Sequence, residues 1–361
     1  METEPVKPNR YVVLPPTGGE VAWSAPFDPT GLPNDCRYFS DVFRQLDDLA
    51  GGNGLTVYLT WSTSYLPSCD ERTVVFLLGD EWCRFPAYSD KVLAVFKVFG
   101  TRPTHLSTVP FRLDALTISS VLQRVRVAAK RVDGLPAKAR WLAKGGHRPV
   151  IKTLPVGSGH TLDCDYIPWD SRSIDIAFLG SVAHGNSGLR NRLPLKSPKQ
   201  LARGQMMDGL KEVARRRPEL TIAAEALGGF HAAMASDAES YSRTLADTRI
   251  ALVPRGTNVE TFRFYEAHRA GCVIVADRMP DNGIYTESSF VTVDRWADLP
   301  VIIEKLLPPV TGGSSDTSGR AHGRLLHEMT RERWQTGLHG DVVGRRAATT
   351  VVTALSGLRP N

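Results

Sequence analysis

The sequence predicts an α/β protein with two domains, each built on a mainly parallel sheet. Its 361 residues exceed what one core usually organises, since domains mostly hold about 100–200 residues. Short apolar runs alternate with segments of helical periodicity along most of the chain, which is typical of parallel strands covered by helices. The apolar share of 42% and the charged share of 23% exclude a disordered, collagen-like or coiled-coil chain.

The first half of the chain carries one set of alternating elements. Its second helix should have an apolar face, because Ile118, Val121, Leu122, Val125 and Ala129 recur at helical spacing. Residues 90–99 are dense in apolar side chains without a clean period, so they fit either a strand or a short helix. The other expected elements are strands at 10–14, 55–61 and 73–78 and helices at 39–49 and 117–132.

A stretch rich in proline and glycine, 153–170, interrupts this pattern and predicts a linker between domains. Beyond it the alternation restarts, so we expect one domain at 1–160, a second at 161–320 and two closing helices within 321–361. The expected strands of the second half are 174–180, 220–224, 249–253, 273–276 and 290–294, and its helices are 198–216, 238–246, 262–270, 299–307, 321–334 and 341–355.

Cysteine usage and hydropathy point to a cytoplasmic protein. The five cysteines share no spacing typical of a zinc site or a disulfide framework. No run approaches the roughly 18 consecutive apolar residues of a membrane helix, and the amino terminus lacks the apolar core of a signal peptide. We therefore expect a cytoplasmic chain without a transmembrane segment.

Positive charge is concentrated between residues 124 and 148, a segment that contains eight Lys and Arg residues and one acidic residue, Asp133. Such a block fits a polyanion, whether nucleic acid, an acidic glycan or an anionic lipid surface. The alternative is a solvated helix face that binds nothing. The basic residues are Arg124, Arg126, Lys130, Arg131, Lys138, Arg140, Lys144 and Arg148.

The richest candidate for a ligand site follows the strand 249–253. Gly256 permits a turn after this strand, and the loop then runs into a helix whose free amides and dipole suit a phosphate. Arg263 adds a forked cation for a diphosphate, and Glu266 lies on the same helix face, where a carboxylate fits the hydroxyls of a ribose. The alternative is an exposed Arg263–Glu266 salt bridge beside a structural turn.

A second glycine-rich turn follows the strand 174–180, and its amides fit the same phosphates unless it is only a surface loop. Together the two turns predict the residues that bind the ligand. They are Gly180, Ser181, Arg255, Gly256, Thr257, Thr261, Arg263 and Glu266.

The order of these elements resembles the exostosin family of glycosyltransferases. The resemblance covers about 170–305, and it departs from the family pattern at Ala251 and Ile274. It is carried by Pro254, Gly256, Thr261, Arg263, Glu266-Ala267 and Ala270-Gly271-Cys272-Val273.

The resemblance implies the GT-B architecture, in which two Rossmann-like domains face a cleft and the carboxyl-terminal helices pack back on the first domain. It implies transfer of a hexose or pentose from a nucleotide diphosphate sugar, such as a UDP-sugar, to an acceptor hydroxyl on a glycan or small molecule. The reaction is expected to invert the anomeric centre and to need neither a metal nor a cofactor. The only D-x-D of this region, Asp163–Asp165, lies in the linker and is not expected to bind a metal.

An inverting enzyme needs a catalytic base, which we expect from the first domain. Asp80 and Glu81 directly follow the strand 73–78, although a turn or helix-capping role is an equal alternative. Trp82, Arg84 and the linker residue His160 are further candidates on the acceptor side.

Two other functions stay open. One is a glycosyltransferase that acts on nucleic acid, such as a hydroxylated base in viral DNA, and uses the basic block 124–148. The other is a protein that binds nucleotide sugars without transferring them.

Overall fold

The computed structural model describes residues 7–33, 36–100, 114–145, 148–159, 164–181, 196–227, 238–280, 283–309 and 317–357. The chain forms two compact units. Unit 1 comprises Met1–Pro103, Val125–Gly159 and Gly337–Asn361, and unit 2 comprises Thr104–Arg124 and His160–Thr336. Each unit contains one largely parallel sheet, so the predicted α/β class is confirmed.

The sheet of unit 1 has the order β2-β1-β3-β4-β5-β6, in which only the short β2 is antiparallel. Its parallel strands lie side by side in chain order, so the direction of winding does not reverse within this sheet. The strands are β1 (Arg10–Leu14), β2 (Val21–Ala22), β3 (Thr56–Thr60), β4 (Thr73–Leu77), β5 (Ala94–Lys97) and β6 (Val150–Thr153).

Two helices from opposite ends of the chain cover unit 1 together, namely α1 (Cys36–Ala50) and α11 (Gly340–Ser356). The rings of Phe39 and Phe43 on α1 lie against Phe76 of β4. A side chain at Gly344 would meet the Val42 carbonyl oxygen at 2.7 Å, so this glycine allows the two helices to approach closely. The helix expected at 39–49 is thus found within α1.

The sheet of unit 2 is entirely parallel and has the order β11-β10-β9-β7-β8. In chain order its first strand, β7, lies between the second and the third, so the direction of winding reverses between β7 and β9. Ligands of doubly wound sheets bind at the carboxyl ends of the strands beside such a reversal. The strands are β7 (Ile174–Ser181), β8 (Ile222–Leu227), β9 (Thr248–Val253), β10 (Val273–Asp277) and β11 (Val291–Val293).

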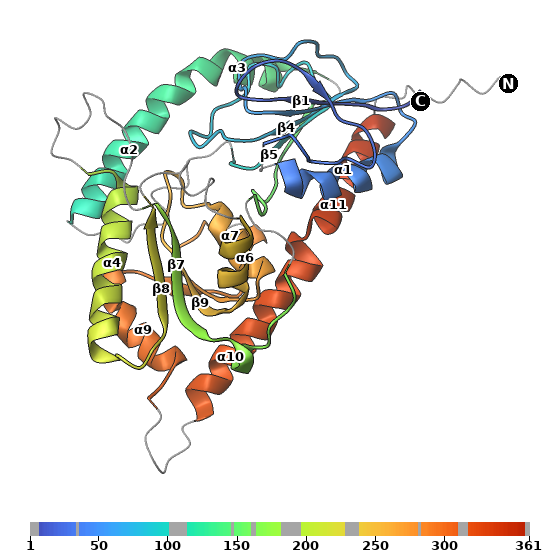
Figure 1. Cartoon of the computed structure of the whole chain (residues 1–361). Coiled ribbons are helices and arrows are strands. Elements are labelled where there is room, and N and C mark those ends of the chain that lie inside the picture. Colours follow the sequence, from blue (N-terminus) through green and yellow to red (C-terminus); the bar gives the residue numbers. More distant parts are fainter. Residues whose placement is uncertain are drawn as a thin grey trace. The chain divides into compact units, whose positions relative to one another are not determined.

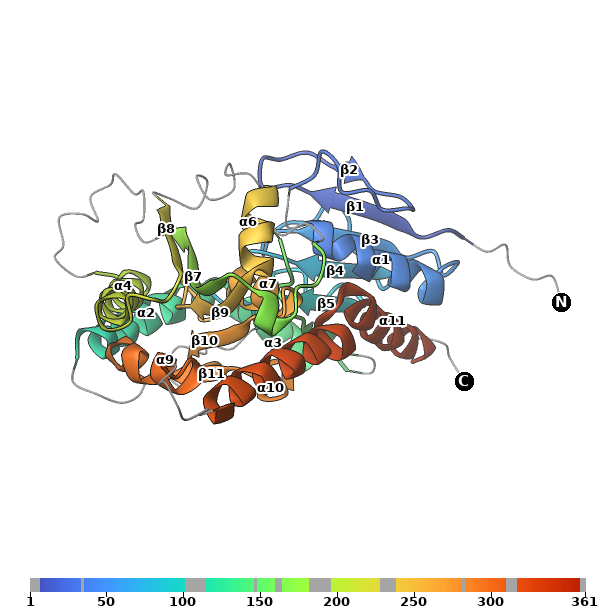
Figure 2. The same ribbon diagram turned by 60° about the horizontal axis from the view of Figure 1, so that its bottom comes forward.

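Helices cover both faces of this second sheet (Figure 1). The helices α4 (Pro198–Arg216) and α9 (Leu299–Leu306) bury one apolar cluster with the strands, including Met206 and Ile303. The opposite face carries α6 (Ala238–Ala246) and α7 (Phe262–Arg269). Figure 2 shows α10 (Thr317–Arg333) near α9, and the short α8 (Gly283–Thr286) precedes β11.

The end of the chain divides differently from the expected segment 321–361. Helix α10 contacts α7, α9 and β10 and belongs to unit 2, whereas α11 packs on α1 in unit 1. Residues 104–124 likewise belong to unit 2, although they were expected in the first domain. None of the described helices is both long and apolar enough to cross a bilayer.

Residues 115–143 form α2 (Ala115–Arg131), a short 3-10 turn (Val132–Gly134) and α3 (Leu135–Ala143). The sequence predicted α2 but missed α3, whose apolar spacing is weak. The predicted apolar face of α2 exists, but it does not join a core: Ile118, Val121, Leu122 and Val125 are all exposed.

Candidate functional site

The loop that joins β9 to α7 lies at the carboxyl end of the second sheet, beside the reversal between β7 and β9. Gly256 makes its first turn tight, because a side chain there would meet the Asn258 carbonyl oxygen at 3.2 Å. The Thr257 carbonyl accepts a hydrogen bond of 2.7 Å from Gln123 on α2. The loop is thus held in place on both sides of its turn.

Arg263 extends from α7 across the end of β7. Its Nε donates to the Leu179 carbonyl oxygen at 2.6 Å, and its guanidinium lies 5.1 Å from the ring centre of Phe178. A Cβ at Gly180 would lie 2.7 Å from the guanidinium carbon. Gly180 therefore leaves the space in which the Arg263 guanidinium lies against the end of β7, beside the reversal.

Glu266 lies one turn further along α7 and is 1% exposed. Its Oε2 accepts a 2.7 Å hydrogen bond from the Tyr241 hydroxyl on α6, which is also hydrogen-bonded to Arg263. Burial, and then the Glu266 carboxylate, raise the pKa of Tyr241 well above its ordinary value. Tyr241 thus connects Arg263 to Glu266, and this burial favours a positioning role for Glu266 over direct contact with a ribose.

A second group of charges lies beneath the loop. Arg203 on α4 donates to the Ser181 carbonyl and, at 3.2 Å, to the Arg255 carbonyl. The Arg255 amide donates to Asp277 Oδ2 at 2.6 Å. These contacts join the ends of β7, β9 and β10, and the side chain of Arg255, at 2% exposed, belongs to the interior rather than to a ligand surface.

Burial shifts the pKa of both ionisable partners in this group. It lowers the pKa of Arg255, which the Asp277 carboxylate partly offsets. It raises the pKa of Asp277, and Arg255 opposes that shift. Sequence reasoning missed Arg203 and Asp277, although Asp277 ends a strand just as the chosen Asp80 follows one.

Thr261 and Glu260 place two buried oxygens beside the start of α7. Thr261 is the N-cap residue of α7, yet its side chain makes no capping bond. Within the described ranges, Thr261 Oγ1 and Glu260 Oε2 have no hydrogen-bond partner. Buried polar atoms nearly always have a partner, so these two oxygens are available to a ligand at the start of α7.

Sequence reasoning also missed Glu260, although it lies in the loop between the selected residues Thr257 and Thr261. It is 5% exposed, and burial raises its pKa to about 7, while a hydrogen bond from Tyr285 opposes the shift. The Tyr285 hydroxyl also lies 2.9 Å from that of Tyr265. Glu260 can therefore exchange a proton near neutral pH.

The first-domain candidate Asp80 is held in a buried ion pair. It is 1% exposed, and its two oxygens accept bonds from Lys97 at 3.0 Å and from Arg84 Nε at 2.9 Å. Burial lowers the pKa of Lys97, and Asp80 opposes this shift. A carboxylate with both oxygens occupied by cations is suited to a structural role, not to accepting a substrate proton.

The other first-domain candidates lie in the same turn or outside the described residues. Glu81 and Trp82 are half-buried, and the side chain of Arg84 is 32% exposed beside Asp80. His160 falls outside the residues that the structure describes. No group of three His, Cys, Asp or Glu side chains in the described part of the chain is arranged to hold a metal ion.

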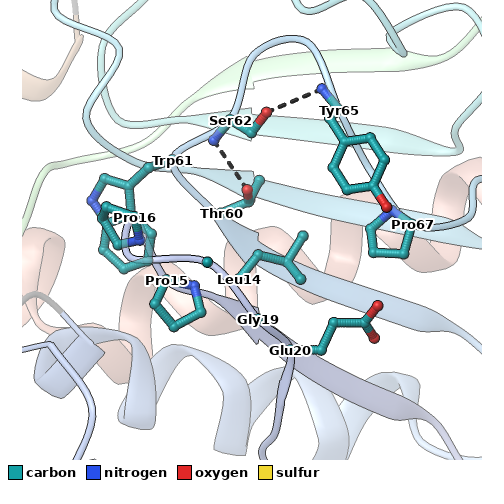
Figure 3. Close-up of a pocket in the computed structure, with 11 residues that line it drawn as sticks. Leu14, Pro15, Pro16, Gly19, Glu20, Thr60, Trp61, Ser62, Tyr65 and Pro67 are labelled. Carbon is teal, nitrogen blue, oxygen red and sulfur yellow. Dashed lines mark hydrogen bonds between the residues drawn. The ribbon is translucent and has the colours of Figure 1, made fainter.

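Unit 1 has a pocket of about 480 Å³ at the carboxyl ends of β1 and β3 (Figure 3). Trp61 and Tyr65 supply aromatic rings, and Glu20 supplies a carboxylate. The Ser62 hydroxyl accepts a 3.0 Å bond from the Tyr65 amide, which shapes the turn after β3. A pocket of this size at the carboxyl edge of a parallel sheet suits a small ligand.

Neither a protein-family model nor a curated protein matches the chain, so the exostosin pattern stays a resemblance. Among solved structures, a chain of a GtfA/B complex is similar, with 14% identity over 80% of this chain and 58% of that one and a TM-score of 0.35. The pneumococcal O-GlcNAc transferase GtfA, solved with UDP and GlcNAc, has 12% identity over 89% of this chain and 60% of its own, with a TM-score of 0.31. The chain therefore spans less than two thirds of the length of either solved chain.

Proposed function

We propose that the chain is a glycosyltransferase that binds a nucleotide diphosphate sugar, such as a UDP-sugar, where β7 and β9 end in unit 2. The observation that carries this proposal is Arg263, which lies over Gly180 and donates to the Leu179 carbonyl at the end of β7, beside the reversal of the sheet. A doubly wound sheet binds nucleotides at this place. The resemblance of residues 170–305 to exostosin enzymes supports the same assignment.

The diphosphate is proposed to bind at the start of α7. The amides of its first turn carry the positive end of the helix dipole, and Thr261 leaves them without a side-chain cap. Arg263, one turn into the helix, supplies a forked cation. Thr261 Oγ1 and Glu260 Oε2, which have no partner in the described part of the chain, supply further polar contacts. Charge on the leaving diphosphate is thus stabilised by amides and Arg263, so the proposed reaction uses no metal and no cofactor.

The acceptor is proposed to bind in the unit 1 pocket of Figure 3. Tyr65, which is 64% exposed, offers a ring on which a sugar can stack. Glu20 is the carboxylate that lines this pocket; among the described residues only its Oε2 is paired, with Arg10 at 3.4 Å in an exposed ion pair. We propose it as the base of an inverting displacement, in which it takes the proton of the attacking hydroxyl. Glu20 replaces Asp80 in this role, while Glu81 stays a second candidate.

The test is a panel of nucleotide sugars, scored by the shift in melting temperature and by hydrolysis of the donor. Arg263→Ala should weaken donor binding by roughly ten- to a hundredfold, because a hydrogen bond from a charged group contributes about 1.5–3 kcal/mol. The matched control is Arg243→Ala on α6, whose side chain is 72% exposed. No shift with any donor would overturn the proposal. Binding without turnover on any acceptor would indicate a nucleotide-sugar-binding protein instead.

A further inference from the structure

Glu260 directly precedes Thr261, the N-cap residue of α7, and is buried within unit 2. Glu260 is 5% exposed, and the preceding Val259 is 1% exposed. The backbone amide of Glu260 donates to Asn258 Oδ1 at 3.4 Å, which holds the chain where it enters the helix. The carboxyl group of Glu260 is therefore withdrawn from bulk water beside the first turn of α7.

The two oxygens of this carboxyl group have different surroundings. The Tyr285 hydroxyl on α8 donates a hydrogen bond to the group and lies 2.9 Å from the Tyr265 hydroxyl on α7. Both tyrosines are at most 2% exposed. Within the described ranges Glu260 Oε2 has no partner, so the bond from Tyr285 belongs to Oε1. This arrangement fixes Oε1 in place and leaves Oε2 to carry a proton.

The surroundings also favour the neutral form of the group. Burial raises the pKa of Glu260 to about 7, and the bond from Tyr285 opposes this shift. The other ionisable side chains of α7, of the loop before it and of β10 are engaged with other groups. These pairs are Arg263 with the Leu179 carbonyl, Glu266 with the Tyr241 hydroxyl, His268 with the Phe264 carbonyl and Arg255 with Asp277.

We propose that Glu260 is the general acid of the transfer and gives its Oε2 proton to the diphosphate as this group leaves the sugar. The inference rests on the proposed function, which puts the diphosphate at the start of α7. The bond between the anomeric carbon and the phosphate oxygen breaks, and its electron pair stays on that oxygen, which takes the proton from Glu260.

The remaining protons of this reaction balance through water. The acceptor oxygen forms the new bond to the anomeric carbon, and its proton goes to the catalytic base. The base and the departed diphosphate return their protons to water, and Glu260 takes one up before the next turnover. One proton is therefore released for each sugar transferred.

A neutral carboxyl group suits this place for an electrostatic reason. A transfer without a metal has to stabilise the charge that develops on the diphosphate. An ionised carboxylate beside the diphosphate would repel it, whereas the neutral form of Glu260 donates to it. A group that is half protonated near pH 7 can also give up its proton and recover it in every turnover.

The binding test is calorimetric titration of the full-length protein with UDP, GDP, ADP and dTDP. If the diphosphate binds beside the neutral carboxyl group, a pKa of about 7 predicts a loss of about tenfold in affinity between about pH 6 and about pH 8. Glu260→Gln keeps a neutral side chain of similar shape and should lack this loss. The terminal phosphate of the probe titrates equally with both proteins, so the difference between them measures Glu260.

The rate test uses the donor that the nucleotide-sugar panel identifies. Glu260→Gln should lower turnover roughly 10²–10⁴-fold and remove the decline of kcat/KM that the unmodified protein shows above about pH 7. Tyr285→Phe removes the bond that opposes the pKa shift of Glu260, so this decline should move to higher pH. A purely structural role of Glu260 would not move the decline.

The matched control is Glu239→Gln on α6, whose side chain is 53% exposed. This variant should keep the turnover and the pH profile of the unmodified protein. Thermal unfolding of all variants at about pH 6, where the Glu260 carboxyl group is mostly neutral, checks that the fold is retained.

The outcomes separate this inference from the proposed function. If none of the four diphosphates binds, the proposed donor site fails and the inference fails with it. If one binds, but Glu260→Gln has the same turnover and pH dependence as the unmodified protein, only the role of Glu260 as an acid is refuted. A raised KM with unchanged kcat and pH profile would assign Glu260 to a hydroxyl of the donor sugar and would likewise overturn the inference.

Discussion

Gly180→Ala should weaken donor binding while leaving every charged residue of the site in place. The new Cβ would lie 2.7 Å from the Arg263 guanidinium carbon, inside any normal contact distance. The obstructing atoms are the far end of a flexible side chain, so Arg263 can move away at little cost to the fold. It would then lose its 2.6 Å bond to the Leu179 carbonyl and its place at the reversal of the sheet.

The expected loss is that of the Arg263 contact with the ligand, about 1.5–3 kcal/mol, or roughly ten- to a hundredfold in donor affinity. Titration calorimetry with the donor found in the panel measures it, and thermal unfolding checks the fold. The control is Gly204→Ala on α4, where a Cβ meets nothing within 4 Å. If Gly180→Ala binds the donor as tightly as Gly204→Ala does, Arg263 does not act from this position. The double variant with Arg263→Ala should be no weaker than Arg263→Ala alone.

Three further predictions concern acidic residues. Because burial raises the Glu260 pKa from 4.5 to about 7, the folded state holds this proton more tightly than the unfolded state does. Stability should therefore fall by up to about 3 kcal/mol as pH rises from about 4.5 to about 7, and denaturant titrations of Glu260→Gln should lack that decline. Asp80→Asn should destabilise the protein by about 3–5 kcal/mol, because it leaves the buried Lys97 without its counter-ion; unchanged stability with lost turnover would instead restore Asp80 as the base. Glu20→Gln should lower turnover about 10²–10⁴-fold with unchanged donor affinity, and wild-type turnover would exclude Glu20.

The sequence predicted the strands and helices of unit 2 well, because their apolar periodicity is strong and their ends carry clear breakers. Helix 198–216 was placed at its observed bounds, for example. The strand order was not accessible in this way. Periodicity shows which segments are strands but not which strands are neighbours, and the reversal between β7 and β9 arises from long-range pairing.

Sequence reasoning selects site residues where a local pattern exists and cannot select residues whose partners come from distant segments. Arg263 was found because it follows a strand, a glycine turn and a helix start. Gly180 was expected to offer its amide, and this stays a prediction; the structure adds that its missing side chain leaves room for Arg263. Arg203 carries no local signal, since its partners at Ser181 and Arg255 lie far away in sequence.

Helix α2 marks the limit of periodicity as a guide to burial. The spacing of Ile118, Val121, Leu122 and Val125 correctly predicted a helix with one apolar face, but spacing cannot tell whether that face meets a core. The orientation is decided by Ser119 and Gln123, whose partners are carbonyl groups 77 and 134 residues away in the chain. These two bonds hold the side of α2 that carries Ser119 and Gln123 inward, so the opposite side with its apolar stripe stays on the surface.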